Sequence, residues 1–103
     1  MKNAILRDVM LSFVRVHILH HASQEAVFGL AMIEELRKHG YAVSPGTLYP
    51  ILHGMEQSGL LKRESEVVSG KVRKYYTATA KGRRTLEELK AKIKELFGEV
   101  FEG

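Results

Sequence analysis

The chain has 103 residues, the size of one small domain, and 45% of them are hydrophobic, an ordinary share for a globular protein. It contains no cysteine, which excludes disulfides and cysteine-ligated zinc and fits a cytoplasmic protein. The net charge of +4 is concentrated in residues 44–84, where eight Lys and Arg face three Asp and Glu. Such a stretch indicates a nucleic-acid partner or a solvated basic face.

Two helices are predicted first, over residues 5–20 and 25–39. Arg7, Asp8 and Arg15 interrupt the apolar N-terminal run, so we expect neither a signal peptide nor a membrane span. The apolar positions that we assign to the inward faces of these helices are Leu6, Met10, Phe13, Leu30, Ile33 and Leu36. A glycine near the start of the second helix, Gly29, permits close backbone packing, and Gly40 ends this helix.

A third helix is predicted from Ser44 to Gly59. Ser44 is a suitable N-cap, Pro45 fits the first helical position, and Gly59 is a suitable stop. The inward face has helical spacing and consists of Leu48, Ile51, Leu52 and Met55. Pro50 lies inside this helix and removes one backbone hydrogen bond, so we expect a local distortion there.

A basic hairpin follows the third helix. Residues 60–67 and 71–79 are predicted strands, joined by a tight turn at Ser69-Gly70. The ribbon has little apolar surface, which is typical of a projecting wing, and we expect at least one of Tyr75 and Tyr76 to be buried.

A final helix is predicted from Ala80 to about Phe101. Its apolar positions repeat at the spacing of a coiled-coil seam, widened by Phe97, and are Leu86, Leu89, Ile93, Leu96 and Val100. This face can cover its own domain or a partner subunit, and we expect a homodimer. The fold class is therefore mainly α with a β-hairpin wing: a winged helix-turn-helix DNA-binding domain over 1–79 and a C-terminal dimerisation helix over 80–103.

The DNA-contacting residues are expected on the outward face of the third helix and on the wing. They are Ser44, Thr47, Tyr49, His53, Lys71, Arg73 and Lys74. No Arg, Asn or Gln stands in the first two turns of the third helix, so we expect DNA shape and backbone contacts to contribute much of the affinity.

No phosphate loop, nucleophile elbow or apolar carboxylate pair is present, so we expect neither an enzyme nor a cofactor. We also expect no metal, although His17, His20 and His21 lie close together along the first helix. A metal-sensing regulator that uses these three side chains is therefore a rival hypothesis.

Three segments carry a resemblance to a known family: Gly46-Thr47-Leu48-Tyr49-Pro50, Ser58-Gly59-Leu60-Leu61, and Lys74-Tyr75-Tyr76-Thr77 leading to Lys81-Gly82. Over nearly its whole length the chain resembles the PadR family of transcriptional regulators, in particular the branch with a short C-terminal tail. The resemblance implies a winged-helix DNA-binding domain and a C-terminal helix that forms the dimer.

The function expected from these features is that of a dimeric, sequence-specific DNA-binding repressor on a pseudo-palindromic operator. A small-molecule effector would release it, bound near Phe13, Phe97 and Phe101. The alternative is a winged-helix module that docks onto another protein and does not bind specific DNA.

Overall fold

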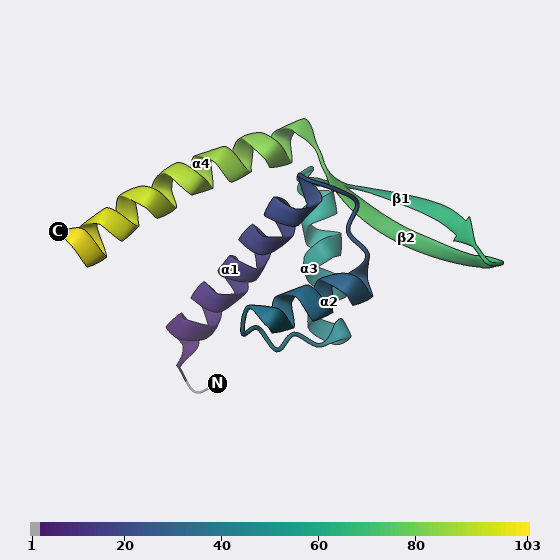
Figure 1. The fold of residues 1–103 in the computed structure, drawn as a ribbon, viewed down its shortest axis with the longest axis horizontal. Helices are drawn as coiled ribbons and strands as arrows, with labels where there is room; N and C mark the ends of the chain where they lie inside the picture. Colours follow the sequence, from purple (N-terminus) through teal and green to yellow (C-terminus); the bar gives the residue numbers. More distant parts are fainter. Residues whose placement is uncertain (1–2) are drawn as a thin grey trace.

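The computed structural model describes residues 3–103. Figure 1 shows a small cluster of three helices, from which a hairpin projects on one side and a long helix on the other. The elements are α1 (Ala4–Ala22), α2 (Gly29–Lys38), α3 (Pro45–Gln57), β1 (Leu61–Val68), β2 (Lys71–Ala78), α4 (Ala80–Phe97) and a π-helical turn (Gly98–Glu102). This mainly helical chain with one antiparallel hairpin confirms the predicted fold class. None of the helices within residues 3–103 combines the length and apolar character that crossing a membrane requires.

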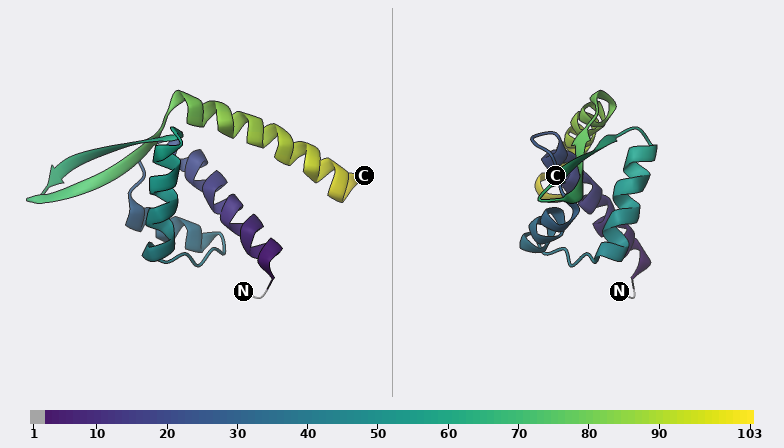
Figure 2. Two further views of the ribbon diagram at one scale, coloured as in Figure 1. Left: turned by 180° about the vertical axis from the view of Figure 1, so that it is seen from behind. Right: turned by 90° about the vertical axis from the view of Figure 1, so that its right-hand side faces the viewer.

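One apolar core lies between α1, α2 and α3 and is closed by the base of the hairpin (Figure 2). The largest fully buried side chains are Val14, Ile18, Leu19, Leu36, Leu48 and Leu52. The predicted inward face of α3 is correct, because all four of its apolar residues are buried. α1 contributes Val14, Ile18, Leu19 and Ala22 to this core.

The predicted face of α1 is wrong in part. Leu6 and Phe13 are exposed, whereas Val14 and Ile18 on the other side of the helix are buried. The cause is that α1 is apolar almost all the way round, so the helical period does not distinguish the side facing the core from the side facing outward.

The start of α2 also differs from the prediction, because the helix begins at Gly29 and not at residue 25. The preceding residues are extended: Val27 N–H donates to the Tyr76 carbonyl at 2.8 Å, and Tyr76 N–H donates to the Val27 carbonyl at 2.9 Å. This bridge fixes the base of the hairpin to the segment before α2. Leu30 is consequently turned outward and is 70% exposed, contrary to the predicted inward position.

α3 remains continuous through Pro50. Ser44 is its N-cap, but the hydroxyl makes no capping bond; the Ser44 carbonyl accepts from Thr47 N–H at 3.0 Å and Leu48 N–H at 2.9 Å. Gly59 has φ +79° directly after the helix, a conformation that glycine adopts without a Cβ penalty.

The hairpin (residues 61–78, hereafter the wing) has the predicted two-residue turn. Ser69 and Gly70 both have positive φ, at 53° and 78°, the conformation that matches the twist of the flanking strands. The register pairs Arg63 with Tyr76 and Val67 with Val72. Tyr76 is buried, as expected for one of the two tyrosines.

The beginning of α4 is tied to the corner between α3 and β1. Thr79 Oγ1 accepts from Gly82 N–H at 3.0 Å and donates to the Gly59 carbonyl at 2.5 Å. Lys81 Nζ donates to the Ser58 carbonyl at 2.8 Å. Gly82 lies so close to the Leu60 carbonyl that a Cβ at this position would overlap it.

We expect Gly82→Ala to lower the free energy of unfolding by about 1–3 kcal/mol, because the added methyl group must push α4 away from the Leu60 backbone. Gly98→Ala is the matched control: Gly98 has helical φ −59° and nothing lies within 4 Å of an added Cβ, so we expect stabilisation of roughly 0.4–1 kcal/mol. Urea denaturation followed by circular dichroism measures both. Equal stability of the two variants would contradict the close contact.

Candidate nucleic-acid interface

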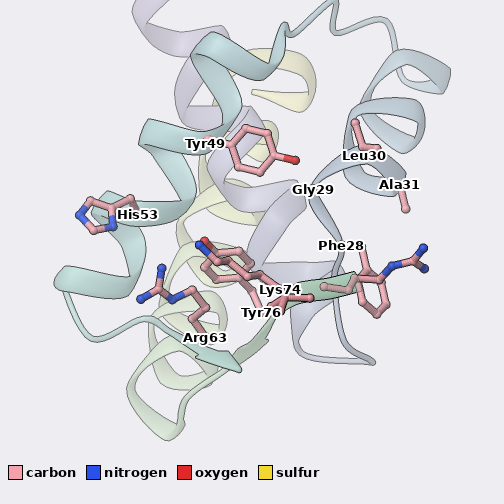
Figure 3. Close-up of a pocket in the computed structure, with 11 residues that line it drawn as sticks. Phe28, Gly29, Leu30, Ala31, Tyr49, His53, Arg63, Lys74 and Tyr76 are labelled. Atoms are coloured by element: carbon pink, nitrogen blue, oxygen red, sulfur yellow. The ribbon is translucent and has the colours of Figure 1, made fainter. Parts of the chain in front are cut away.

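A groove of about 630 Å³ runs between the start of α2, the exposed side of α3 and one face of the wing. Figure 3 shows side chains from all three elements around it. α3 contributes Tyr49 and His53, and the wing contributes Arg63, Arg73 and Lys74. Two aromatic residues, Phe28 and Tyr76, also line it, so the groove combines an apolar floor with cationic edges.

The position of Tyr49 depends on Gly29. An added Cβ at Gly29 would lie 2.5 Å from the Tyr49 hydroxyl oxygen and 2.7 Å from the nearest ring carbon atoms. The glycine expected to allow close packing therefore receives the Tyr49 ring. Phe28, the N-cap of α2, supplies no side-chain hydrogen bond to the helix. The first N–H groups of α2 have no intrahelical acceptor, as in any α-helix, and here no N-cap side chain replaces it. They lie at the edge of the groove, where a helix N-terminus favours negative charge.

The cations of the wing have few anionic neighbours. Within residues 3–103 the ion pairs of the wing are Lys62 with Glu64 at 3.1 Å and Arg63 with Glu56 at 3.7 Å. These pairs leave Lys71, Arg73 and Lys74 without a carboxylate, and all three are exposed.

Arg73 is nevertheless held in place. Its guanidinium carbon lies 5.6 Å from the centre of the Phe28 ring, a cation–π distance, and Phe28 in turn lies against Tyr75 with ring centres 5.8 Å apart. Tyr75 O–H donates to Glu64 at 2.8 Å. This hydrogen bond, aided by Lys62, lowers the pKa of the Glu64 carboxyl and raises the pKa of the Tyr75 hydroxyl. The carboxylate of Glu64 is thus committed within the wing and does not neutralise Arg73.

Four of the seven predicted DNA-binding residues line one groove: Tyr49, His53, Arg73 and Lys74. The others lie beyond it: Ser44 and Thr47 at the start of α3, with their hydroxyl oxygens 3.4 Å apart, and Lys71 beside the turn of the wing.

Sequence reasoning missed Arg63 as a site residue. Its position opposite Tyr76 in the register turns it toward the groove. The alternation of β1 contained the signal, because Arg63 shares a face with the buried Leu61.

The predicted dimer seam on α4 divides into two parts. Leu86 is buried in its own subunit at 7% exposure, and Leu89 packs partly against the same core. The remaining seam residues are exposed: Ile93, Leu96 and Phe97 in the second half of α4, and Val100 in the π-helical turn that follows. α1 exposes apolar side chains as well, at Ile5, Leu6, Val9 and Phe13.

The three aromatic residues predicted to bind an effector are exposed. Phe97 and Phe101 lie against each other with ring centres 5.0 Å apart. Phe13, Phe97 and Phe101 line neither the groove beside the wing nor the shallow hollow on α4 around Leu89.

The model of the "Transcriptional regulator PadR-like family" matches residues 18–88, which include α2, α3 and the whole wing. The chain is 48% identical over 98 residues to the transcriptional regulator Rv3488 of Mycobacterium tuberculosis, covering 95% of this chain and 92% of that protein.

Solved structures agree with this match. A PadR-like transcription factor from Bacteroides fragilis is similar with a TM-score of 0.82 and 30% identity, covering 95% of this chain and 96% of the other. A PadR-like regulator from Bacillus cereus is similar with a TM-score of 0.77 and 33% identity, covering 93% and 98%. The chain therefore belongs to the PadR-like family of transcriptional regulators.

Proposed function

We propose that this regulator binds double-stranded DNA as a homodimer and represses transcription from a pseudo-palindromic operator. The observation that carries the proposal is the set of wing cations, Lys71, Arg73 and Lys74, which have no carboxylate partner within residues 3–103. Arg73 and Lys74 line the groove beside the exposed side of α3, and Lys71 lies farther out, at the turn of the wing. Unpaired cations around a groove are suited to the phosphate backbone of DNA.

In this proposal α3 enters the major groove and the wing lies over the adjacent backbone. Thr47, Tyr49 and His53 of α3 and its N-cap Ser44 face the DNA, and the N–H groups at the start of α2 donate hydrogen bonds to a phosphate. Neither Ser44 nor Thr47 can form the two-pronged base contact of Arg, Asn or Gln. Much of the specificity therefore comes from DNA shape and from the spacing of the two half-sites.

The homodimer is supported by the apolar surface that one subunit leaves uncovered. α4 exposes Leu96 and Phe97, and α1 exposes Leu6 and Phe13. Burial of such side chains against a second copy removes apolar surface from water and stabilises a small domain. Two-fold symmetry then places the two copies of α3 about one helical turn of DNA, roughly 34–36 Å, or a multiple apart.

Release by a small molecule completes the proposal. An effector between the subunits, near Phe13, Phe97 and Phe101, would change the angle between them. It acts only if it binds the DNA-bound and released arrangements with different affinity.

We expect alanine replacement of Lys71, Arg73 and Lys74 together to weaken binding to the DNA upstream of the protein's own gene by roughly tenfold or more. The salt dependence should also flatten, by about 0.9 in the slope of log K against log salt for each lost phosphate contact. Fluorescence anisotropy at several salt concentrations measures both quantities.

The matched control replaces Lys90, Lys92 and Lys94 of α4 with alanine, which removes the same charge from a surface distant from the groove. Binding should stay near that of the parent protein. If both triple variants lose the same affinity, the wing has no special role. If the parent binds the natural and a scrambled duplex equally and without salt dependence, the protein-docking alternative replaces DNA binding.

We expect Leu96→Glu to convert the dimer to monomers, because it places a carboxylate in the apolar surface between subunits. Leu96 is 58% exposed within one subunit, so helix content should not change. Sedimentation equilibrium measures the mass, and anisotropy should show weaker operator binding in the same sample.

Ala91→Glu is the control for this variant, since position 91 lies on the opposite side of α4 and is exposed. It should remain dimeric. A parent protein that sediments as a monomer, or a Leu96→Glu variant that stays dimeric, would contradict the proposed interface.

A further inference from the structure

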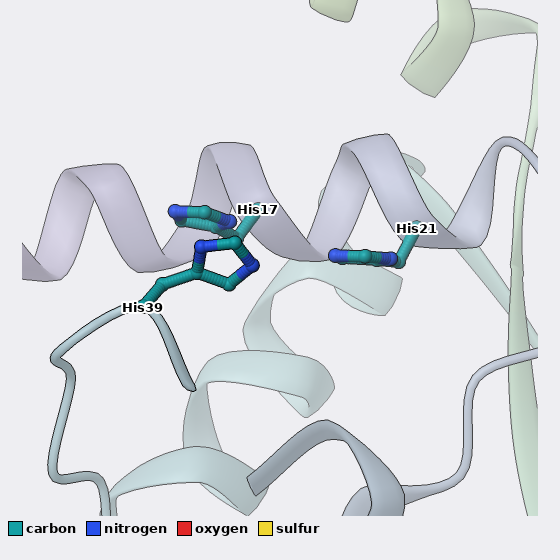
Figure 4. Close-up of side chains that lie close together, drawn as sticks. All are labelled: His17, His21 and His39. Carbon is teal, nitrogen blue, oxygen red and sulfur yellow. The ribbon is translucent and has the colours of Figure 1, made fainter. Parts of the chain in front are cut away.

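We propose that His17, His21 and His39 form a binding site for a divalent transition metal ion of the Zn²⁺ class. Figure 4 shows the three imidazole rings gathered between α1 and the residue that follows α2. One ring nitrogen from each histidine lies within 4.8 Å of the other two. This site is separate from the groove and does not depend on DNA binding.

The geometry requires only side-chain rotation to close on an ion. A tetrahedral zinc ion with Zn–N bonds of about 2.0–2.1 Å places its ligand nitrogens about 3.3 Å apart. His17 and His21 lie one turn apart on α1, at the i, i+4 spacing, with stacked rings. His39 approaches from the end of α2, its ring centre 4.8 Å from that of His17, and its exposure leaves room for adjustment.

A carboxylate completes the surroundings of the rings. Glu35 Oε1 lies 3.3 Å from His39 Nε2 and 3.6 Å from His21 Nε2. Metal-bound histidines usually donate their second ring N–H to a carboxylate or carbonyl, which orients the ring and raises its basicity. Glu35 is therefore assigned as the residue that positions His21 and His39.

The protonation state suits a metal ligand. Burial lowers the pKa of His17, and repulsion from His39, His21 and His20 lowers it further, against the opposing effect of Glu35. Neutral imidazole is the form that coordinates metal, and imidazole nitrogen is a preferred donor for Zn²⁺, Ni²⁺ and Co²⁺. His17 and His21 are only partly covered, so an ion can enter from solvent.

No metal is expected from the sequence, and the ligand set also differs from that of the rival hypothesis of a metal-sensing regulator. His20 was grouped with His17 and His21, but it is exposed and is not part of the cluster. His39 replaces it. Its participation depends on the packing of α2 against α1, which sequence spacing does not reveal.

The test is a titration of the protein with Co²⁺, with any affinity tag removed, followed by visible absorption spectroscopy. Bound Co²⁺ should give the intense bands of low-symmetry coordination by nitrogen, and Zn²⁺ should displace it because it binds such sites more tightly. His39→Ala and His17→Ala should each weaken Co²⁺ binding by more than the roughly 10–100-fold typical of losing an outer partner. Glu35→Gln should weaken it by about tenfold.

His20→Ala is the matched control, because it removes a neighbouring histidine that lies outside the cluster, and it should bind Co²⁺ like the parent. The proposal is overturned if the parent gives no Co²⁺ spectrum, or if His20→Ala and His39→Ala reduce binding equally. A second measurement is the melting temperature: Zn²⁺ at 100 times its Kd should raise it on the order of 10 °C in the parent, and not in His39→Ala. An unchanged melting temperature in the parent also overturns the proposal.

A regulatory consequence rests on the proposed function. The metal would join α1, whose outer side is apolar, to the end of α2, directly before the turn that leads into α3. It would thereby fix the angle between the dimer surface and the DNA-reading helix. Zn²⁺ should change operator affinity in the parent and not in His39→Ala; unchanged affinity despite a Co²⁺ spectrum would overturn this consequence. Because the Co²⁺ titration contains no DNA, failure of the metal site and failure of DNA binding give different results.

Discussion

The contact between Gly82 and the Leu60 carbonyl holds the three functional parts of this protein in one geometry. α3 ends at this corner, the wing begins there, and α4 leaves from the same point. Thr79 reinforces the contact, because its hydroxyl caps α4 and also donates to the Gly59 carbonyl. The angle between α3 and α4 is consequently set by backbone atoms, which cannot yield as a flexible side chain would.

The charged side chains near the wing divide into those that pair with one another and those that do not. Glu64 is engaged by Tyr75 and Lys62, and Glu56 lies beside Arg63, so these two carboxylates are committed to local partners. Glu66 stands opposite Arg73 in the register, without an ion pair among the described residues. Arg73 rests on the Phe28 ring and has no ion pair with a carboxylate among the described residues. The groove thus presents cations at its edges without placing an unpaired charge in the core.

The apolar side chains of α4 likewise divide into a buried and an exposed part. The inner part of α4 completes the core through Leu86, whereas the outer part leaves Leu96 and Phe97 in solvent. A heptad repeat does not indicate which of its residues complete the core and which remain exposed, since both sets have the same kind of side chain at the same spacing. The position at which the seam residues change from buried to exposed depends on how far α4 extends past α1, which is a property of the fold.

Several local features of this protein follow directly from its sequence. Ser44, Pro45 and Gly59 bound α3, Ser69-Gly70 make the turn of the wing, and the family match follows from the same segments. These features depend on backbone conformation and on neighbours within a few residues, so the chain encodes them directly. Which side of α1 is buried depends on tertiary packing, because this helix carries apolar residues on more than one side. Tertiary packing also brought Arg63 to the groove and His39 to the two histidines of α1, since both placements depend on elements that are distant in sequence and meet only when the core packs.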